Sequence, residues 1–209
     1  MTLRTEIRRY RWISFLLVLA LGFASACVPT QAWAAKKALQ VYFIDVEGGQ
    51  STLFVTPTGQ SLLIDTGWPD HEGRDADRIV DAAKRAGISK IDYVLLTHYH
   101  DDHSGGIPQL AERFPIGTFV DHGPNRDTKP GGPTEKVWND YQKVLATGKY
   151  KHIVATTGQM LPITGMKVTV ISSDVRSLPD GGNSERPITR KRVVLSARSS
   201  IPAATVVRP

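Results

Sequence analysis

Cysteine is almost absent from this chain of 209 residues, since Cys27 is the only one. No disulfide can therefore form within the chain, and after residue 27 no thiolate is present to serve as a nucleophile or a metal ligand. Histidine is also scarce, with six residues, but three of the six fall within residues 98–103. Any reactive chemistry is therefore expected from imidazole and carboxylate groups, and the histidine cluster is the place to look for it.

An excess of positive charge is missing from the middle of the chain, although the whole chain carries a formal net charge of +6. Residues 1–34 account for +3 and residues 180–209 for +4, which leaves −1 for residues 35–179. A nucleic-acid-binding protein is expected to carry a basic face on its folded part. That class of function rests here on the net charge alone and is disfavoured, so no nucleic-acid partner is expected.

No apolar run is long enough for a comfortable membrane-spanning helix, and the longest candidate covers residues 12–26. A basic stretch ends at Arg11 just before this run, and residues 32–34 show the small-x-small pattern that precedes a cleavage site. We therefore expect residues 1–34 to be a signal peptide and the protein to be exported, periplasmic or secreted, with no membrane span after cleavage. Two alternatives remain open: an uncleaved amino-terminal anchor, and a lipid attached to Cys27.

Three short strands are expected next in the chain. Apolar and β-branched residues fill 39–46, 50–56 and 61–65, and the turn-length links between them predict an antiparallel meander. Helical and strand patterns then alternate, with helices expected over 72–86, 104–114 and 134–147 and strands over 91–97, 116–121, 152–155 and 166–171. This order predicts a layered α/β domain over 35–173. The remainder, 174–209, shows no sustained period and is expected to be an irregular basic tail.

The sequence His98-Tyr99-His100-Asp101-Asp102-His103 places three imidazoles and two carboxylates within six residues, directly after the expected buried strand 91–97. Imidazole and carboxylate are natural ligands of zinc and similar divalent ions, and the spacing of His98 and His100 suits an extended loop. Gly105-Gly106 is expected to let backbone pass close to a metal pocket, and the helix after it to direct its first N–H groups toward the site. A divalent-metal site is therefore predicted, and a histidine-rich surface turn without metal is the disfavoured alternative.

The stretch Thr97-His98-Tyr99-His100-Asp101-Asp102-His103-Ser104-Gly105-Gly106 resembles the signature of the metallo-β-lactamase superfamily. Upstream, residues 41–51 and 63–67 most resemble the hydrolase domain of ComEC-type competence proteins. The resemblance covers about residues 39–173. It implies a four-layer αββα sandwich and, usually, two metal ions, most often zinc. The expected fold class is therefore α/β, a partial αββα metallo-β-lactamase sandwich that comprises the amino-terminal half and part of the second half.

Position by position, the resemblance implies roles for individual residues. His98 and His100 would bind the first metal, and Asp102 and His103 the second. Asp102 would also be the catalytic residue, because it orients the hydroxide that lies between the ions. Asp65 would act behind the ligands by fixing the loop that carries them.

The chain also departs from the family pattern. A complete site needs a further histidine, a bridging aspartate and a last histidine from the later half, but only His122 and His152 follow residue 103. His122 is a candidate for the edge of the site, and His152 is expected in packing or at the surface. A truncation or a change of reading frame is the expected explanation.

Two functions follow from this pattern. One is an exported hydrolase that uses metal-activated hydroxide on a small-molecule or phosphoester substrate, with a phosphodiester, an ester or a lactam as the target bond. The other is a catalytically inactive remnant that serves as a binding or structural module.

Overall fold

The computed structural model describes residues 38–126, 130–173, 176–177, 194–198 and 204–207, all of which belong to one compact unit, Lys36–Pro209. The expected signal peptide, with Cys27 in it, lies outside the described residues. Within the part that is described, no helix is both long and apolar enough to cross a membrane.

A sheet of seven strands forms the centre of this unit, in the order β11-β1-β2-β3-β4-β5-β6. Its first three strands in the chain are β1 (Leu39–Phe43), β2 (Thr52–Val55) and β3 (Ser61–Ile64), and they pair antiparallel as the predicted meander. The next three run parallel to β3 and to one another: β4 (Ile91–Leu95), β5 (Ile116–Asp121) and β6 (Lys151–Val154). The carboxyl ends of β3 to β6 therefore meet at one edge of the sheet.

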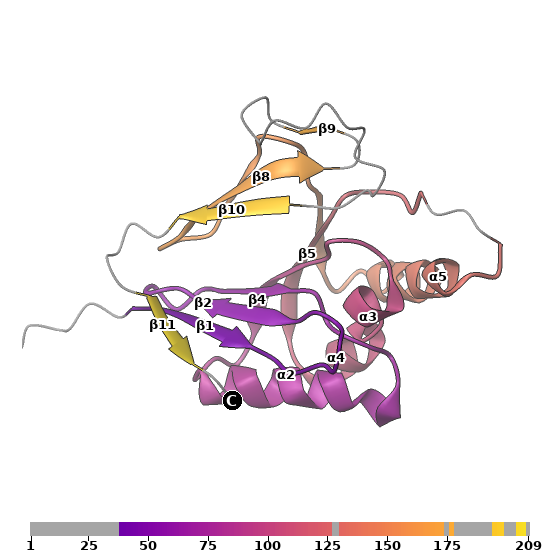
Figure 1. The fold of residues 1–209 in the computed structure, drawn as a ribbon, viewed down its shortest axis with the longest axis horizontal. Helices are drawn as coiled ribbons and strands as arrows, with labels where there is room; N and C mark the ends of the chain where they lie inside the picture. The colour runs from indigo at the N-terminus through magenta and orange to yellow at the C-terminus, as the bar shows by residue number, and fades with distance from the viewer. Residues whose placement is uncertain (1–37, 127–129, 174–175, 178–193, 199–203, 208–209) are drawn as a thin grey trace, which may run out of the picture. The chain divides into compact units, whose positions relative to one another are not determined.

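Helices cover one face of this sheet (Figure 1). They are the 3-10 turn η1 (His71–Gly73), α2 (Arg74–Arg85), α3 (Asp101–Ser104), α4 (Ile107–Arg113) and α5 (Pro133–Ala146). The amphipathic pattern explains the orientation of α2, because its apolar residues recur at helical spacing and are buried against the strands. The helix expected over 104–114 is α4, which begins only at Ile107; the single turn α3 precedes it, and Gly105-Gly106 separates the two.

A second sheet lies on the other face of the first (Figure 1). It contains β7 (Met160–Leu161), β8 (Lys167–Ser173) and β10 (Val194–Arg198), and the short β9 (Arg176–Ser177) pairs with β8. Strand alternation fills the two cores: Leu63 points to the helices, and its neighbour Leu62 packs against Val168 in the second sheet's core. The described residues thus form three layers, helix, sheet and sheet, of the four expected.

Regular structure also occurs in the stretch predicted to be an irregular tail. Besides β9 and β10 it contains β11 (Ala204–Val207), which pairs parallel with β1 at the edge of the first sheet. Strand pairing supplies partners for exposed sheet edges, and valines suit such positions. The rest of residues 174–209 lies outside the described residues, and a domain boundary at 173 stays a prediction.

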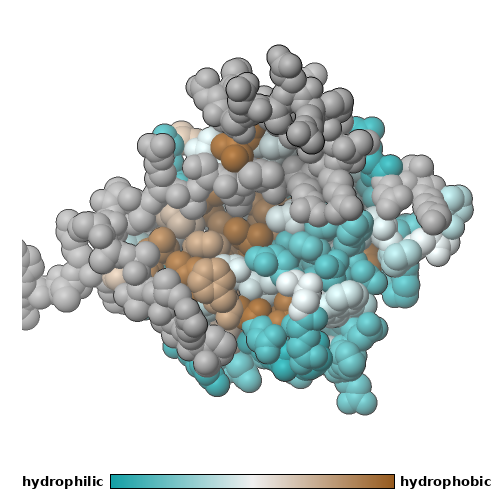
Figure 2. Space-filling view, viewed as in Figure 1, coloured by the Kyte–Doolittle hydropathy of each residue, from teal (hydrophilic) through white to brown (hydrophobic). Residues whose placement is uncertain are grey.

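The hydropathy of the surface in view differs between the strands and the helices. Figure 2 shows hydrophobic residues gathered over the strands β1 and β2 on the face in view, and hydrophilic residues over the helices. Phe43, at the end of β1, is among the large apolar side chains that remain exposed, at 55%.

Candidate metal centre

The histidine loop follows β4 at the carboxyl edge of the parallel strands. His98 lies in irregular backbone after the strand, and the chain then turns into the single helical turn α3, which contains Asp102 and His103. The expectation of an extended loop therefore holds only for its first half. Ser104 N and Gly105 N donate to the carbonyls of His100 and Asp101, so backbone hydrogen bonds shape the second half as a helix.

The three imidazole rings of the loop gather around His98. Its ring centroid lies 4.5 Å from that of His100 and 4.0 Å from that of His103. His98 is buried, the side chain of His103 is 20% exposed, and His100 is exposed. The cluster thus opens toward solvent on one side, as a site for an ion and its substrate must.

Asp102 lies beside the ring of His103 at the partly exposed side of the cluster. Its Oδ2 is 3.5 Å from His103 Nε2, and its side chain is 26% exposed. The predicted residues His98, His100, Asp102 and His103 are therefore neighbours in space, and one carboxylate and three imidazoles share one small region.

Asp65 is the buried residue that ties this loop to β3. Its carboxylate accepts hydrogen bonds from Thr97 N at 2.8 Å, from Thr97 Oγ1 at 2.7 Å and from His103 Nδ1 at 2.8 Å. Because a carboxylate only accepts, Nδ1 of His103 carries a proton in this pair, which leaves the lone pair of the neutral ring on Nε2. Burial raises the pKa of the Asp65 carboxyl, and the hydrogen bonds from His103 and Thr97 oppose that rise.

The backbone of Asp65 is unusual as well. Its φ of 60° lies in the left-handed region, which aspartate tolerates better than most residues. This conformation places the carboxylate under the loop, while Asp65 N donates to Leu95 O and the backbone carbonyl of Asp65 accepts from Ser51 Oγ. Non-glycine residues in such conformations cluster at functional sites.

The glycine pair after the ligands packs tightly against neighbouring backbone, and its closeness to a metal pocket stays a prediction. A Cβ on Gly106 would meet the carbonyl oxygen of Thr66, and one on Gly105 would meet Asp101 and Pro69. Gly106 N also donates to Gly67 O at 3.1 Å. These glycines therefore let the loop dock closely on the turn that follows β3.

The donor set fits a divalent ion in its chemistry but falls short in number. Neutral imidazole and carboxylate are the groups that zinc prefers, and His103 Nε2 faces Asp102 in the cluster. Among the described residues, however, no group of three or more histidine, cysteine, aspartate or glutamate side chains is placed to hold a metal ion. In this arrangement the loop supplies part of a site.

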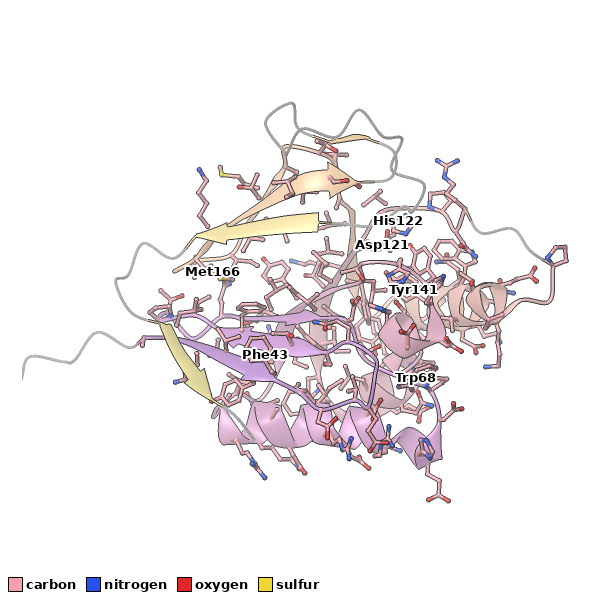
Figure 3. The ribbon with its side chains drawn as sticks, in the orientation of Figure 1. Phe43, Trp68, Asp121, His122, Tyr141 and Met166 are labelled. Carbon is pink, nitrogen blue, oxygen red and sulfur yellow. The ribbon has the colours of Figure 1, made fainter. Side chains whose placement is uncertain are left out.

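The two later histidines lie in a second polar cluster, His122 just past the end of β5 and His152 near the start of β6. Asp121 is fully buried, and its Oδ2 accepts from Tyr141 Oη and from His152 Nε2, both at 2.7 Å. His122 is buried, and its ring centroid lies 4.8 Å from that of Tyr99. Figure 3 shows Asp121, His122 and Tyr141 together at this place.

The sequence interpretation missed Asp121, Tyr141 and Tyr99. The available signal was an aspartate that ends an otherwise apolar strand, which predicts a buried and therefore partnered carboxylate. Burial raises the pKa of the Tyr99 and Tyr141 hydroxyls, and the Asp121 carboxylate raises both further, so both phenols stay protonated and act as donors.

Comparison with known proteins places these features in a family. The family model described as the metallo-beta-lactamase superfamily matches residues 45–186. The chain is 34% identical over 84 residues to an atrochrysone carboxyl ACP thioesterase of Emericella nidulans, over 39% of this chain and 26% of the relative. It is 31% identical over 106 residues to a hydroxyacylglutathione hydrolase of Stenotrophomonas maltophilia, over 51% of this chain and 37% of the relative.

Among solved structures, the chain is similar to MEM-A1, a subclass B3 metallo-beta-lactamase from a soil metagenome library, with a TM-score of 0.47 and 16% identity. That likeness covers 80% of this chain and 60% of the other. The chain spans less than two fifths of the length of the two curated relatives named above, at 26% and 37%. The family model covers well over half of the sequence, and the chain belongs to the metallo-beta-lactamase superfamily.

Proposed function

We propose that this protein is a metal-dependent hydrolase whose histidine loop holds a divalent cation, most fittingly zinc. The ligands would be His98, His100, Asp102 and His103. The observation that carries the proposal is the gathering of three imidazole rings, with centroids 4.0 and 4.5 Å apart, at the carboxyl edge of the parallel strands. Open α/β sheets bind their ligands at this edge.

The residues of the chain have separate tasks in this proposal. Asp65 holds the proton of His103 on Nδ1, so that the Nε2 lone pair is free to bind the ion. Asp102, partly exposed beside that ring, accepts a hydrogen bond from the attacking water and orients it. The ion, when bound, lowers the pKa of its water to about 7 and so provides hydroxide at neutral pH.

The substrate class follows from the chemistry and from the relatives. The hydroxide that a bound ion would supply suits acyl and phosphoryl centres, so the target bond would be an ester, a thioester, a phosphodiester or a lactam. The thioesterase among the relatives favours an acyl substrate. The likeness of residues 41–51 and 63–67 to ComEC-type hydrolase domains favours a phosphodiester instead. We propose a small-molecule substrate that carries one of these bonds.

A catalytically inactive binding or structural module is the second candidate. It is favoured by one observation: the part of the chain that the structure describes contains no three-donor group placed for an ion. Such a module would bind metal weakly and hydrolyse nothing.

Metal content and hydrolysis measured on the same samples separate the two candidates. After dialysis against zinc, the hydrolase is expected to retain at least one ion per chain, and the module well under one. His98→Ala is expected to lose metal and activity. His71→Asn is the matched control, because His71 is exposed, lies away from the loop in sequence and has a left-handed φ of 54° that asparagine tolerates. Chromogenic ester, thioester, phosphodiester and lactam substrates identify the bond; no turnover above the His98→Ala background would favour the module.

Export is a proposal of its own, based on the basic and apolar pattern of residues 1–34. The intact mass of protein recovered from a bacterial periplasm tests it. A chain that begins at Ala35 supports cleavage, whereas a chain that begins at Cys27 with an added lipid mass would indicate an anchored protein.

A further inference from the structure

Tyr99 lies between two predicted metal ligands but points away from them. Successive side chains in extended backbone alternate between two sides, so the neighbours of an inward residue face outward. Tyr99 is 2% exposed and belongs to the core between the sheet and the helices. Its ring centroid lies 4.6 Å from that of Trp138 and 6.1 Å from that of Tyr141, both on α5.

The hydroxyl of Tyr99 is anchored to the next strand. It donates a buried hydrogen bond of 2.6 Å to the backbone carbonyl of Gly123, which follows β5. Gly123 has a φ of 88°, a conformation that favours glycine, and its N–H donates to Asp121 Oδ1 at 2.7 Å. The acceptor for Tyr99 is therefore held in place by a second hydrogen bond.

The anchor extends beyond β5 to α5 and β6. The other oxygen of the Asp121 carboxylate accepts from Tyr141 on α5 and from His152 on β6. A continuous set of hydrogen bonds, buried except where His152 joins it, thus links two strands and a helix to the middle of the histidine loop. Figure 3 shows Asp121 and Tyr141 at the centre of this set.

From these contacts we propose that Tyr99 is a positioning residue for the metal site. Its phenol is fixed by Gly123 and by the rings of Trp138 and Tyr141, and it thereby holds its neighbours His98 and His100 in a binding arrangement before any ion binds. The proposal rests on the proposed function, in which this loop binds the cation. A leucine would fill the same apolar space, but only a phenol can also form the hydrogen bond to Gly123 that fixes the position and orientation of the loop backbone. Such preorganisation reduces the ordering that binding would otherwise require.

The test compares Tyr99→Phe with Tyr150→Phe. Tyr150 is the control for loss of a phenol hydroxyl in this core, because its ring packs against Phe119 and its hydroxyl makes only a long, part-buried bond of 3.4 Å to the carbonyl of Ala111. Both variants keep the ring and are expected to fold, and thermal unfolding measures what each loses in stability. Two readouts follow: hydrogen exchange of the His103 and Ser104 amides, which both donate to the carbonyl of His100, in metal-free protein, and zinc affinity by competition with a chromophoric chelator.

Tyr99→Phe is expected to speed exchange of these loop amides about fivefold, the effect of one lost hydrogen bond. It is also expected to weaken zinc binding about tenfold or more, as changes behind metal ligands do. Tyr150→Phe is expected to change neither. Equal effects of the two variants on both readouts would overturn the proposal. If the wild-type chain binds no zinc, the proposed function is wrong, and the exchange comparison alone decides whether Tyr99 holds the loop.

Discussion

Asp65→Asn should move the proton of His103 from Nδ1 to Nε2 while lowering the unfolding free energy only slightly. Asparagine keeps the shape of the side chain and tolerates the φ of 60° found here. Its oxygen can still accept from Thr97 N, and the hydroxyl of Thr97 can rotate to accept from the new amide. The amide cannot accept from His103 Nδ1, which lies 2.8 Å from the oxygen that is replaced. Only one of the three hydrogen bonds to Asp65 is therefore lost.

Two outcomes are open to His103 in this variant, and their magnitudes differ. If its proton stays on Nδ1, two donors face each other in a buried place, which costs about 1–3 kcal/mol of unfolding free energy. If the proton moves to Nε2, Nδ1 accepts from the amide and the loss is about 0–1 kcal/mol by the same comparison. We expect the second outcome, because relief of the clash requires only a tautomer change. The Nε2 atom would then carry hydrogen where the ion must bind.

Nitrogen-15 NMR of the histidine rings measures the tautomer directly, and chemical denaturation measures the stability. The expected result is an Nε2-protonated ring in metal-free Asp65→Asn, with zinc affinity weakened about tenfold to a hundredfold. Asp92→Asn is a matched control, because that carboxylate also accepts from a backbone N–H and a hydroxyl, those of Ser61, but lies at the other end of β4. A ring that stays protonated on Nδ1 while zinc affinity is unchanged would refute the reasoning.

Three further predictions concern stability. Gly106→Ala should lower the unfolding free energy by about 2 kcal/mol or more in denaturant titration, because its Cβ would overlap the carbonyl of Thr66; an unchanged midpoint would contradict the close docking. Asp121→Ala should cost about 3–5 kcal/mol, because it leaves buried donors without an acceptor; a loss below about 1 kcal/mol would show that the network is dispensable. Hydrogen bonds from Lys136 and then Lys143 lower the pKa of Asp140 from 3.8, so its contribution is present at neutral pH and is lost as the pH falls below that value. Asp140→Asn should therefore cost about 0.3–0.5 kcal/mol at pH 7 and nothing near pH 2, measured by urea unfolding at each pH; a cost that persists at pH 2 would contradict the sign.

Elements whose signals are local were predicted well from the sequence. The strand Ile116–Asp121 has the predicted bounds, since Pro115 precedes its apolar run and a polar pair ends it. The helix expected over 104–114 is present but begins only at Ile107, because Gly106 docks on Thr66, a residue forty positions earlier. The strand β11 was not expected, because its structure depends on the free edge of β1, and no periodicity within four residues reveals such a partner.

The candidate site shows the same division between local and distant information. The ligand types and their order can be predicted because all four lie on one short segment. The residues that hold these ligands in place cannot be predicted in this way, because they follow two other strands, far away in the sequence. Asp65 reaches His103 from β3, 38 residues away, and Gly123 reaches Tyr99 from beyond β5, 24 residues away.

These two supports act on different parts of the loop. Asp65 fixes the helical half, where it sets the proton of His103, and Tyr99 fixes the extended half between His98 and His100. A loop of six residues held at both halves by buried bonds needs little reordering when an ion binds. A metal site is therefore indicated less by the number of histidines than by these supports, because a histidine-rich surface turn would not require a buried carboxylate bonded to His103 or a buried phenol on the residue between His98 and His100. The same supports orient the loop whether or not further donors complete the site.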